Sequence, residues 1–258
     1  MAITVGVFGA SGRMGRTVCA AVNADPETEL VAAVDPFAVG DRVEGVTIAA
    51  DPEAMSETGV AVAVDFTVAS AARSNVEWAA KHGLHAVVGT SGFTADDLTS
   101  FRAAFEAAGR ACVVAPNFAI GAVLAIRLAE LAAPYFDTAE VIELHHDAKR
   151  DAPSGTAMHT VERLAAASPD WADDPTVDEM IPGARGGLGP AGIRVHSVRM
   201  RGMVAHEEVL LGTTGQTLSI RHDSYDRTSF MPGVLLAIKR VGSLPPGLTV
   251  GLDSLLDL

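Results

Sequence analysis

The sequence predicts an α/β protein with two domains. We expect an N-terminal, Rossmann-like domain with a doubly wound parallel sheet, and a second α+β domain with a mixed or antiparallel sheet. Three observations indicate this fold class. Short, nearly continuous apolar runs alternate with helix-like segments over the first half of the chain, which is typical of a parallel sheet covered on both faces. A glycine-rich turn directly follows the first apolar run. After about residue 118 a long apolar helix and several extended runs joined by short turns indicate an α+β domain.

Strand and helix signals alternate regularly through the first half. The first expected strand, Ile3 to Phe8, leads into the turn Gly9 to Gly15 and a helix from about Arg16 to Ala24. Gly83 suits a helix C-terminus, and Thr94 with an acid three positions later is typical of a capping box. The other strands expected here are Leu30–Val34, Ala61–Phe66, His85–Val88 and Ala111–Val114, and the other helices are Ala69–Lys81 and one capped by Thr94 that ends at Ala108.

The second half opens with an alanine- and leucine-rich helix, Ile120 to Tyr135, followed by the strand Glu140 to His145. A loop and a helix ending near Ala167 come next. Residues 168–190 are rich in Pro, Asp and Gly, so we expect an irregular excursion. The remaining elements expected are the strands Ile193–Met203, Glu207–Leu211 and Thr217–His222, and a final helix, Ser229–Val241, followed by a short apolar tail.

The composition limits the classes of function. Hydrophobic residues make up 48% of the 258 residues and charged residues 20%, which is typical of a soluble globular protein. The net charge of −13 argues against nucleic acid, because binding its backbone needs a basic face. No segment resembles a signal peptide, and the longest apolar stretches are too short to cross a bilayer. We therefore expect a cytoplasmic protein with no nucleic-acid or membrane partner, and we interpret Cys19 and Cys112 as buried free thiols.

The turn after the first strand has the spacing G-x-x-G-x-x-G, a variant of the dinucleotide-binding fingerprint. Glycines let the backbone turn sharply and approach a pyrophosphate, which the N–H groups of the next helix then bind. Asp35 ends the second strand 20 residues after Gly15, where an acid accepts hydrogen bonds from the adenine ribose hydroxyls. The alternative is a tight turn without a ligand. The turn residues expected at the cofactor are Gly9, Ala10, Ser11, Gly12, Arg13, Met14 and Gly15.

The identity of the nicotinamide cofactor stays open from sequence. Asp35 favours NADH, because a carboxylate repels a 2′-phosphate, whereas Arg13 and Arg16 lie close enough in sequence to counter that repulsion. We expect NADH to be used and leave NADPH open.

The ends of the later strands fall at the carboxyl edge of the sheet, where open α/β sheets bind ligands. Small residues are also common in ordinary loops, so topology alone leaves both readings open. The residues expected at the cofactor from this edge are Phe66, Thr67, Gly89, Thr90, Ser91, Ala115, Pro116, Asn117 and Phe118.

The most informative segment is the loop between the strand ending at His145 and the helix after Pro153. Two histidines and a lysine at the strand's end can supply protons at neutral pH. Small and hydroxyl residues open the next helix, so backbone N–H groups and a threonine hydroxyl can bind a carboxylate. This predicts a pocket for a carboxylated substrate that is protonated during the reaction. The residues concerned are His145, His146, Lys149, Ser154, Gly155 and Thr156.

A metal site is the rival interpretation of His145, His146 and Asp147. Adjacent residues in a regular strand point to opposite faces, so neighbouring histidines rarely share one ion. No later histidine has obvious ligand spacing. We therefore predict no metal, and we expect the strand to break near His146 if both histidines serve one pocket.

The motif His145-His146-x-x-Lys149-x-Asp-Ala-Pro-Ser-Gly-Thr156-Ala resembles the hallmark of the 4-hydroxy-tetrahydrodipicolinate reductase family, long called dihydrodipicolinate reductase. The resemblance covers nearly the whole chain. Residues 9–15 resemble the family's cofactor turn, 88–93 its nicotinamide-side loop, 115–121 its hinge and 222–230 the stretch that returns to the first domain. Ser91 departs from the family, which often has threonine there, and residues 36–57 do not match.

The resemblance implies NAD(P)H-dependent reduction of 4-hydroxy-tetrahydrodipicolinate, a small cyclic dicarboxylate, to tetrahydrodipicolinate with loss of water, in lysine biosynthesis through diaminopimelate. It implies that His145 is the general acid/base near the ring and that Lys149 donates a proton to the ring intermediate. His146, Gly155 and Thr156 would hold a substrate carboxylate, with Arg227 nearby.

The resemblance further implies a dinucleotide-binding domain of residues 1–117 plus 228–258, and a substrate-binding and oligomerisation domain of residues 118–227. It implies a homotetramer built through the second domain's sheet, and closure of the domains over substrate. Two alternatives remain, another NAD(P)-dependent dehydrogenase of an amino-acid pathway and a non-catalytic dinucleotide sensor. The His-His-x-x-Lys loop argues against the first, and retained proton donors argue against the second.

Overall fold

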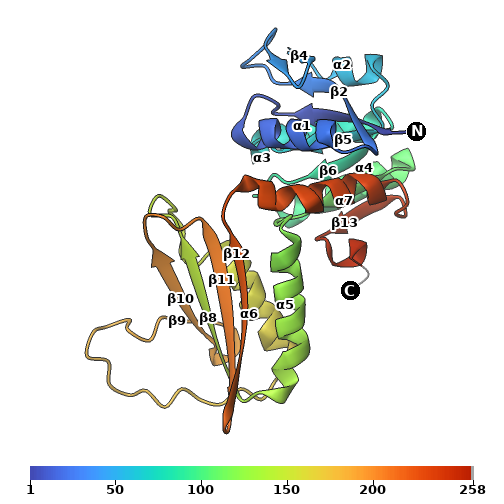
Figure 1. The fold of residues 1–258 in the computed structure, drawn as a ribbon. Coiled ribbons are helices and arrows are strands. Elements are labelled where there is room, and N and C mark those ends of the chain that lie inside the picture. Colours follow the sequence, from blue (N-terminus) through green and yellow to red (C-terminus); the bar gives the residue numbers. More distant parts are fainter. Residues whose placement is uncertain (257–258) are drawn as a thin grey trace. The chain divides into compact units, whose positions relative to one another are not determined.

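The computed structural model describes residues 1–256 and confirms the α/β fold class (Figure 1). The chain divides into two compact units. The first contains Met1–Phe118 together with the chain from Arg227 onward, and the second contains Ala119–Asp226. Each junction lies one residue away from the boundary suggested by the sequence.

The first unit is built on an eight-stranded sheet with the order β13-β7-β6-β5-β1-β2-β4-β3. Its neighbouring strands run parallel except at the β3–β4 edge. Every residue of β5 and β7 is buried, because helices cover both faces of the sheet. The strands are β1 (Ile3–Phe8), β2 (Thr28–Val34), β3 (Arg42–Val43), β4 (Val46–Ala49), β5 (Val62–Asp65), β6 (His85–Val88), β7 (Ala111–Val114) and β13 (Gly247–Val250).

Helices pack on both faces of this sheet. Helices α1 and α7 contact each other on one face and α3 and α4 on the other, as Figure 1 shows. Phe101 and Phe105 of α4 are buried in the core cluster beneath that helix. The predicted capping box of α4 is confirmed. The Thr94 hydroxyl accepts a hydrogen bond from the Asp97 N–H, and the Asp97 carboxylate accepts one from the Thr94 N–H. The helices are α1 (Arg13–Ala24), α2 (Glu53–Glu57), α3 (Ala69–Lys81), α4 (Ala95–Ala108) and α7 (Met231–Val241).

Three details of the first unit differ from expectation. Helix α1 begins at Arg13 rather than about Arg16, because Gly12 within the turn is already the N-cap. Residues 42–57, where the sequence analysis named no helix or strand, form β3, β4 and α2. The apolar tail is in part a strand, β13, which pairs with β7 at the sheet's edge.

The second unit is a five-stranded sheet, order β12-β11-β8-β10-β9, with helices on one face. Only the β8–β10 pair runs parallel among the described strands, so the sheet is mixed. Val141, Val209 and Leu211 point from the sheet into a core shared with the two helices. The elements are α5 (Ile120–Ala132), β8 (Thr138–His145), α6 (Gly155–Ala167), β9 (Gly187–Leu188), β10 (Arg194–Arg199), β11 (Ala205–Thr213) and β12 (Gln216–Ser224).

Two expected elements of this unit are shorter in the structure. The strand expected over Ile193–Met203 ends at Arg199, and Gly202 then turns the chain with a φ of +88°. Helix α5 ends at Ala132 and gives way to a 3₁₀ turn containing Pro134, because proline cannot continue the hydrogen-bond ladder.

Candidate active site

The glycine turn has the geometry that a pyrophosphate site needs. Gly9 has a φ of +71°, and Gly12, which has no side chain to cap the helix, is the N-cap of α1. A Cβ on Gly15 would lie 2.0 Å from the carbonyl oxygen of Gly9, so only glycine lets α1 pack this closely on the turn. The first N–H groups of α1 lack intrahelical partners by helix geometry and are therefore available to an anion.

Asp35 is fixed at the end of β2 and is 5% exposed. Its carboxylate accepts hydrogen bonds from the Ser11 N–H (3.1 Å), the Ser11 hydroxyl (2.5 Å) and the Phe37 N–H (3.0 Å). Burial opposes ionisation, but these hydrogen bonds outweigh it and hold the pKa of Asp35 below its usual value. The acid therefore remains an anion at neutral pH.

A cavity of about 380 Å³ lies beside Asp35 in the first unit. This volume is within the range of small-molecule sites. The turn glycines, the fixed carboxylate and the apolar walls together fit a dinucleotide bound with its ribose hydroxyls at Asp35. The lining residues are Phe8, Gly9, Gly12, Val34, Asp35, Pro36, Phe37, Ala50, Pro52, Phe66, Thr67, Val68, Ala71 and Asn75.

The other predicted edge residues are organised by Asp65, which sequence reasoning missed. Asp65 ends β5, is 2% exposed and accepts hydrogen bonds from the hydroxyls of Thr67 (2.8 Å) and Thr90 (2.7 Å). The sequence did contain a sign of this role, because a charged residue stands at the end of an otherwise apolar strand. The structure thus brings the ends of β5 and β6 together through one carboxylate.

Phe66 packs between two other predicted residues. Its ring lies so close to Gly89 that a Cβ there would be 2.0 Å from a ring carbon, and it is 5.6 Å from the Phe118 ring. Ala115 extends β7 through an N–H bond to the Val88 carbonyl (3.0 Å). Ser91 and Pro116 are exposed, and Asn117 is half-buried.

In the second unit, β8 ends at His145 and His146 is exposed just beyond it, so the strand breaks where expected. The Nδ1 atom of His145 lies 2.5 Å from Oε2 of Glu143. Burial lowers the pKa of His145 against the opposing effect of Glu143, which favours the charged imidazolium. The described residues contain no group of three or more His, Cys, Asp or Glu placed to hold a metal ion.

Glu143 is fully buried, and the sequence analysis gave it no role. It accepts two hydrogen bonds from Arg199 at the end of β10 (2.8 and 2.7 Å) and one from the Ser154 N–H (3.2 Å). Burial opposes its ionisation, but hydrogen bonds from Arg199, Ser197 and His145 hold the pKa of Glu143 below its usual value. Its contact with His145 could have been predicted, because residues two apart on a strand point to the same face.

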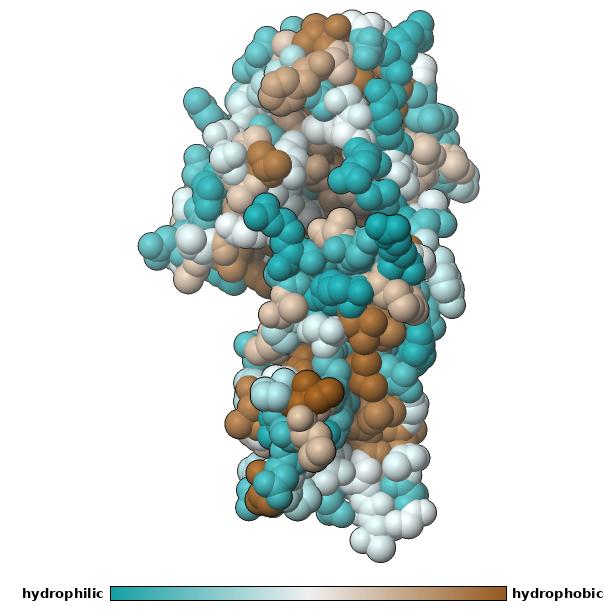
Figure 2. All heavy atoms as spheres, turned by 90° about the vertical axis from the view of Figure 1, so that its left-hand side faces the viewer, coloured by the Kyte–Doolittle hydropathy of each residue, from teal (hydrophilic) through white to brown (hydrophobic). Residues whose placement is uncertain are grey.

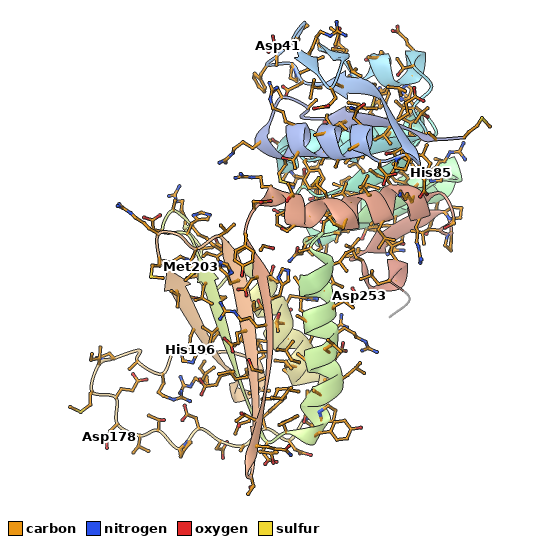
Figure 3. The ribbon with its side chains drawn as sticks, viewed as in Figure 1. Asp41, His85, Asp178, His196, Met203 and Asp253 are labelled. Carbon is orange, nitrogen blue, oxygen red and sulfur yellow. The ribbon has the colours of Figure 1, made fainter. Side chains whose placement is uncertain are left out.

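Lys149 is half-buried in the loop after β8. Its ammonium group lies 3.0 and 2.9 Å from the two carboxylate oxygens of Asp151, and this contact holds the pKa of Asp151 below its usual value. The Asp151 carbonyl accepts a hydrogen bond from Arg199 (2.6 Å). The loop with Lys149 is therefore connected to the Glu143–Arg199 pair. Met203, labelled in Figure 3, lies in the turn that joins β10 to β11 at this end of the sheet.

The N-terminus of α6 is open at its first residues. The Ser154 hydroxyl caps the helix by accepting a hydrogen bond from the Ala157 N–H (3.1 Å). The sequence analysis had expected Ser154 at the substrate and had not assigned it this structural role. Gly155 has open space where a Cβ would stand, and Thr156 is half-buried. Arg227, expected at the end of the second domain, belongs instead to the first unit, where it begins a 3₁₀ turn.

Glu207 is a second carboxyl that the sequence analysis did not single out. It stands directly opposite Glu143 in the β8–β11 pair and lies 2.5 Å from the Thr160 hydroxyl of α6. Burial, with the nearby Glu143 charge, raises the pKa of Glu207 to about 7. Sequence alone gives the spacing along one strand, whereas this contact depends on the register between two strands.

Another cavity of about 380 Å³ lies in the second unit at the opposite end of the sheet from His145. Its walls include Trp171, Arg185 and Arg194, and none of the predicted site residues lines it.

A Rossmann-like unit with an open glycine turn, together with a second unit that gathers a histidine, a lysine and an open helix N-terminus, defines a nicotinamide-dinucleotide-dependent oxidoreductase. Two family models cover almost all of the chain. The model described as the N-terminus of dihydrodipicolinate reductase matches residues 3–118, and the model of its C-terminus matches residues 121–256. The chain belongs to the dihydrodipicolinate reductase family.

Individual relatives agree with this assignment. The chain is 51% identical over 269 residues to the 4-hydroxy-tetrahydrodipicolinate reductase of Nocardia farcinica, covering 100% of both proteins. It is 51% identical to the reductase of Thermobifida fusca over 261 residues, 99% of this chain and 100% of that protein. Among solved structures, dipicolinate-bound dihydrodipicolinate reductase from Paenisporosarcina sp. TG-14 superposes with a TM-score of 0.89 at 36% identity, covering 98% of this chain and 99% of that one.

More distant structures share the fold alone. An amine dehydrogenase from Mycobacterium smegmatis has a TM-score of 0.65 at 16% identity, covering 96% of this chain and 94% of its own. Within the described residues, no helix has the length and apolar character needed to span a membrane.

Proposed function

We propose that this chain reduces 4-hydroxy-tetrahydrodipicolinate to tetrahydrodipicolinate with loss of water, using NADH or NADPH, in lysine biosynthesis through diaminopimelate. The observation that carries this proposal is the group formed by His145, Lys149 and the open N-terminus of α6, in a chain of this family. When bound, the reduced nicotinamide supplies the hydride. Both units contribute, the first by binding the dinucleotide and the second by binding the substrate.

In the first unit, the N-terminus of α1 binds the pyrophosphate and Asp35 accepts hydrogen bonds from the adenine ribose. The ionised Asp35 carboxylate favours NADH, because it repels a 2′-phosphate. Phe66 and the ends of β5, β6 and β7 form the nicotinamide side.

In the second unit, the first N–H groups of α6 and the Thr156 hydroxyl bind a substrate carboxylate, with His146 beside them. Lys149 and His145 act on the ring side: Lys149 donates a proton from Nζ, and His145 serves as the general acid/base through Nε2, since Nδ1 faces Glu143. In a protein of net charge −13, cations gathered at one end of a sheet provide the attraction that a dianion needs. We also propose that Arg227, which begins a 3₁₀ turn in the first unit, binds the substrate.

We also propose a cytoplasmic homotetramer built through the sheet of the second unit, with no nucleic-acid or membrane partner. Helices α5 and α6 both pack on one face of this sheet. The opposite face carries half-buried apolar side chains, namely Ile142, Leu144, Val198 and Leu210. Figure 2 shows exposed hydrophobic residues among hydrophilic ones on the surface of this unit. Burying such a face between copies is the usual way to remove it from water.

The test is oxidation of NADH, and separately NADPH, by the purified protein supplied with the cyclic product of the synthase that condenses pyruvate with aspartate semialdehyde. We expect rapid oxidation that depends on the synthase, faster with NADH. Absence of oxidation with an active synthase would refute the proposal and favour another dehydrogenase activity or a dinucleotide sensor. Light scattering of the same sample tests the tetramer.

A further inference from the structure

One buried carboxylate connects the separate parts of the proposed catalytic group. Glu143 contacts His145 on its own strand, Arg199 at the end of β10 and the Ser154 N–H at the start of α6. Two of these contacts come from β8 and from the start of α6, which follows it in the chain, whereas Arg199 of β10 is 56 residues away in the sequence. The carboxylate therefore joins the histidine, a cation and the helix N-terminus at one point.

Each contact follows from the position of Glu143 in the sheet. Residues two apart on a strand share a face, so the Glu143 and His145 side chains stand side by side on β8. Strand β10 runs parallel to β8 with Arg199 opposite His145, and the arginine reaches back to Glu143 with both terminal nitrogens. Such a bidentate pair fixes orientation as well as charge.

We propose that Glu143 is the positioning residue of the active site: it holds the His145 proton on Nδ1 and orients the ring, so that Nε2 exchanges the proton with substrate. This inference rests on the proposed role of His145. Glu143 does not touch substrate in this scheme. It acts on the ring as the aspartate of a Ser-His-Asp triad acts on its histidine, by fixing the tautomer and stabilising the imidazolium.

The charges around Glu143 keep it suited to this role. Arg199 from β10 and Lys149 from the loop are the nearby cations, and Glu207 faces it from β11. Arg199 favours the ionised Glu143 carboxylate, whereas Glu207 opposes it when charged. From α6 the contacts are uncharged, an N–H of Ser154 to Glu143 and the Thr160 hydroxyl to Glu207. Glu143 thus stays an anion that accepts a proton-bearing Nδ1.

The first experiment is ¹⁵N NMR of histidine-labelled wild-type protein, with the His145 signals assigned by comparison with His145→Asn. We expect the neutral ring of His145 to carry its proton on Nδ1. A neutral ring protonated on Nε2 would overturn the proposal. This measurement needs no substrate and no Glu143 variant, so it decides the point even if the proposed reaction fails.

The second experiment compares Glu143→Gln with Glu140→Gln. Glu140 is a matched control, because it lies on the same strand but on the opposite face and also bonds an arginine, Arg185 (2.7 Å), and a histidine, His196 (2.7 Å). Figure 3 labels His196 on β10. In Glu143→Gln the amide favours the other tautomer of His145, so we expect kcat to fall by about 10³- to 10⁴-fold. Glu140→Gln keeps kcat within about twofold of wild type.

Two further measurements on these variants separate positioning from a purely structural effect. NADH affinity stays within about twofold in Glu143→Gln, because the dinucleotide site belongs to the other unit. As pH rises, the variant loses its residual activity at a lower pH than wild type does. The reason is that the His145 imidazolium has lost the carboxylate that stabilised it. A variant with wild-type kcat, or with reduced kcat but an unchanged pH profile and tautomer, would contradict the proposal.

Discussion

Replacing Glu207 by glutamine should remove a pH-dependent loss of stability from the second unit. The carboxyl lies between β11 and α6, 2.5 Å from the Thr160 hydroxyl, which also lies 3.0 Å from the Thr156 carbonyl oxygen. One hydroxyl hydrogen cannot serve both acceptors. A protonated Glu207 resolves this, since it donates to Thr160 while Thr160 donates to Thr156. Glutamine preserves the size and the donor without the acid.

The magnitude follows from the pKa of Glu207, which burial raises from 4.5 to about 7. Folding therefore favours the protonated carboxyl, and the folded protein binds more protons than the unfolded chain between these pH values. The free energy of unfolding falls as pH rises through this interval and stays low above it. At about 1.4 kcal/mol per pKa unit, the loss above pH 7 reaches at most about 3.5 kcal/mol.

The assay is urea unfolding of wild type and Glu207→Gln at pH 5, 6, 7 and 8. The two proteins should be similarly stable at pH 5, and the variant should be more stable at pH 8 by up to about 3.5 kcal/mol. Groups that titrate in both proteins cancel in the difference, and Glu208→Gln on the other face of β11 controls for the change in net charge. A stability difference that does not vary with pH, or a variant less stable at pH 8, would refute the reasoning.

Three further predictions concern the proposed reaction and its cofactor. Lys149→Ala should lower kcat by about 10²- to 10⁴-fold while NADH affinity stays near normal, because only a proton donor is lost; stopped-flow titration and turnover assays check this with Lys81→Ala as control, and equal loss of both would sink that division of roles. Asp35→Asn should raise NADPH use relative to NADH by about tenfold, since removing a charge near a 2′-phosphate relieves about 1–4 kcal/mol of repulsion; an unchanged ratio of kcat/KM values would be contrary evidence. Gly15→Ala should cost about 1–3 kcal/mol and weaken NADH binding, because the new Cβ would meet the Gly9 carbonyl oxygen at 2.0 Å, whereas Gly242→Ala, with its nearest atom at 3.9 Å, should be tolerated in a thermal melt.

Local signals accounted for most of the fold. The glycine turn, the capping box at Thr94 and the buried strands β5 and β7 are each determined by neighbours in sequence, and each was predicted. The edge strand β13 was missed because its four residues, Gly247–Val250, become a strand only by pairing with β7. The strand expected to continue to Met203 was too long for a related reason: apolar and polar residues still alternate through Arg201, but the turn at Gly202 ends the strand.

The candidate site was predicted where its residues lie in one segment and missed where they do not. His145, Lys149 and Thr156 fall within one short loop, so their pattern is readable directly. The contacts of Glu143 with Arg199, and of Glu207 with Thr160, depend on strand register and helix packing. The position of Asp65 between Thr67 and Thr90 likewise depends on the β5–β6 pair. A single sequence contains the members of such networks but not which of them meet.

The insertion of the second unit between β7 and α7 affects the order in which the protein can be made. Residues 119–226 are continuous, so this unit can complete its sheet as soon as β12 leaves the ribosome. The first unit begins earlier but lacks α7 and β13 until after β12 of the second unit has been made. The part synthesised first is therefore finished last, which reverses the usual N-terminal-first order of domain folding. A message truncated just before Met231 would yield an intact second unit attached to a first sheet with an open edge at β7.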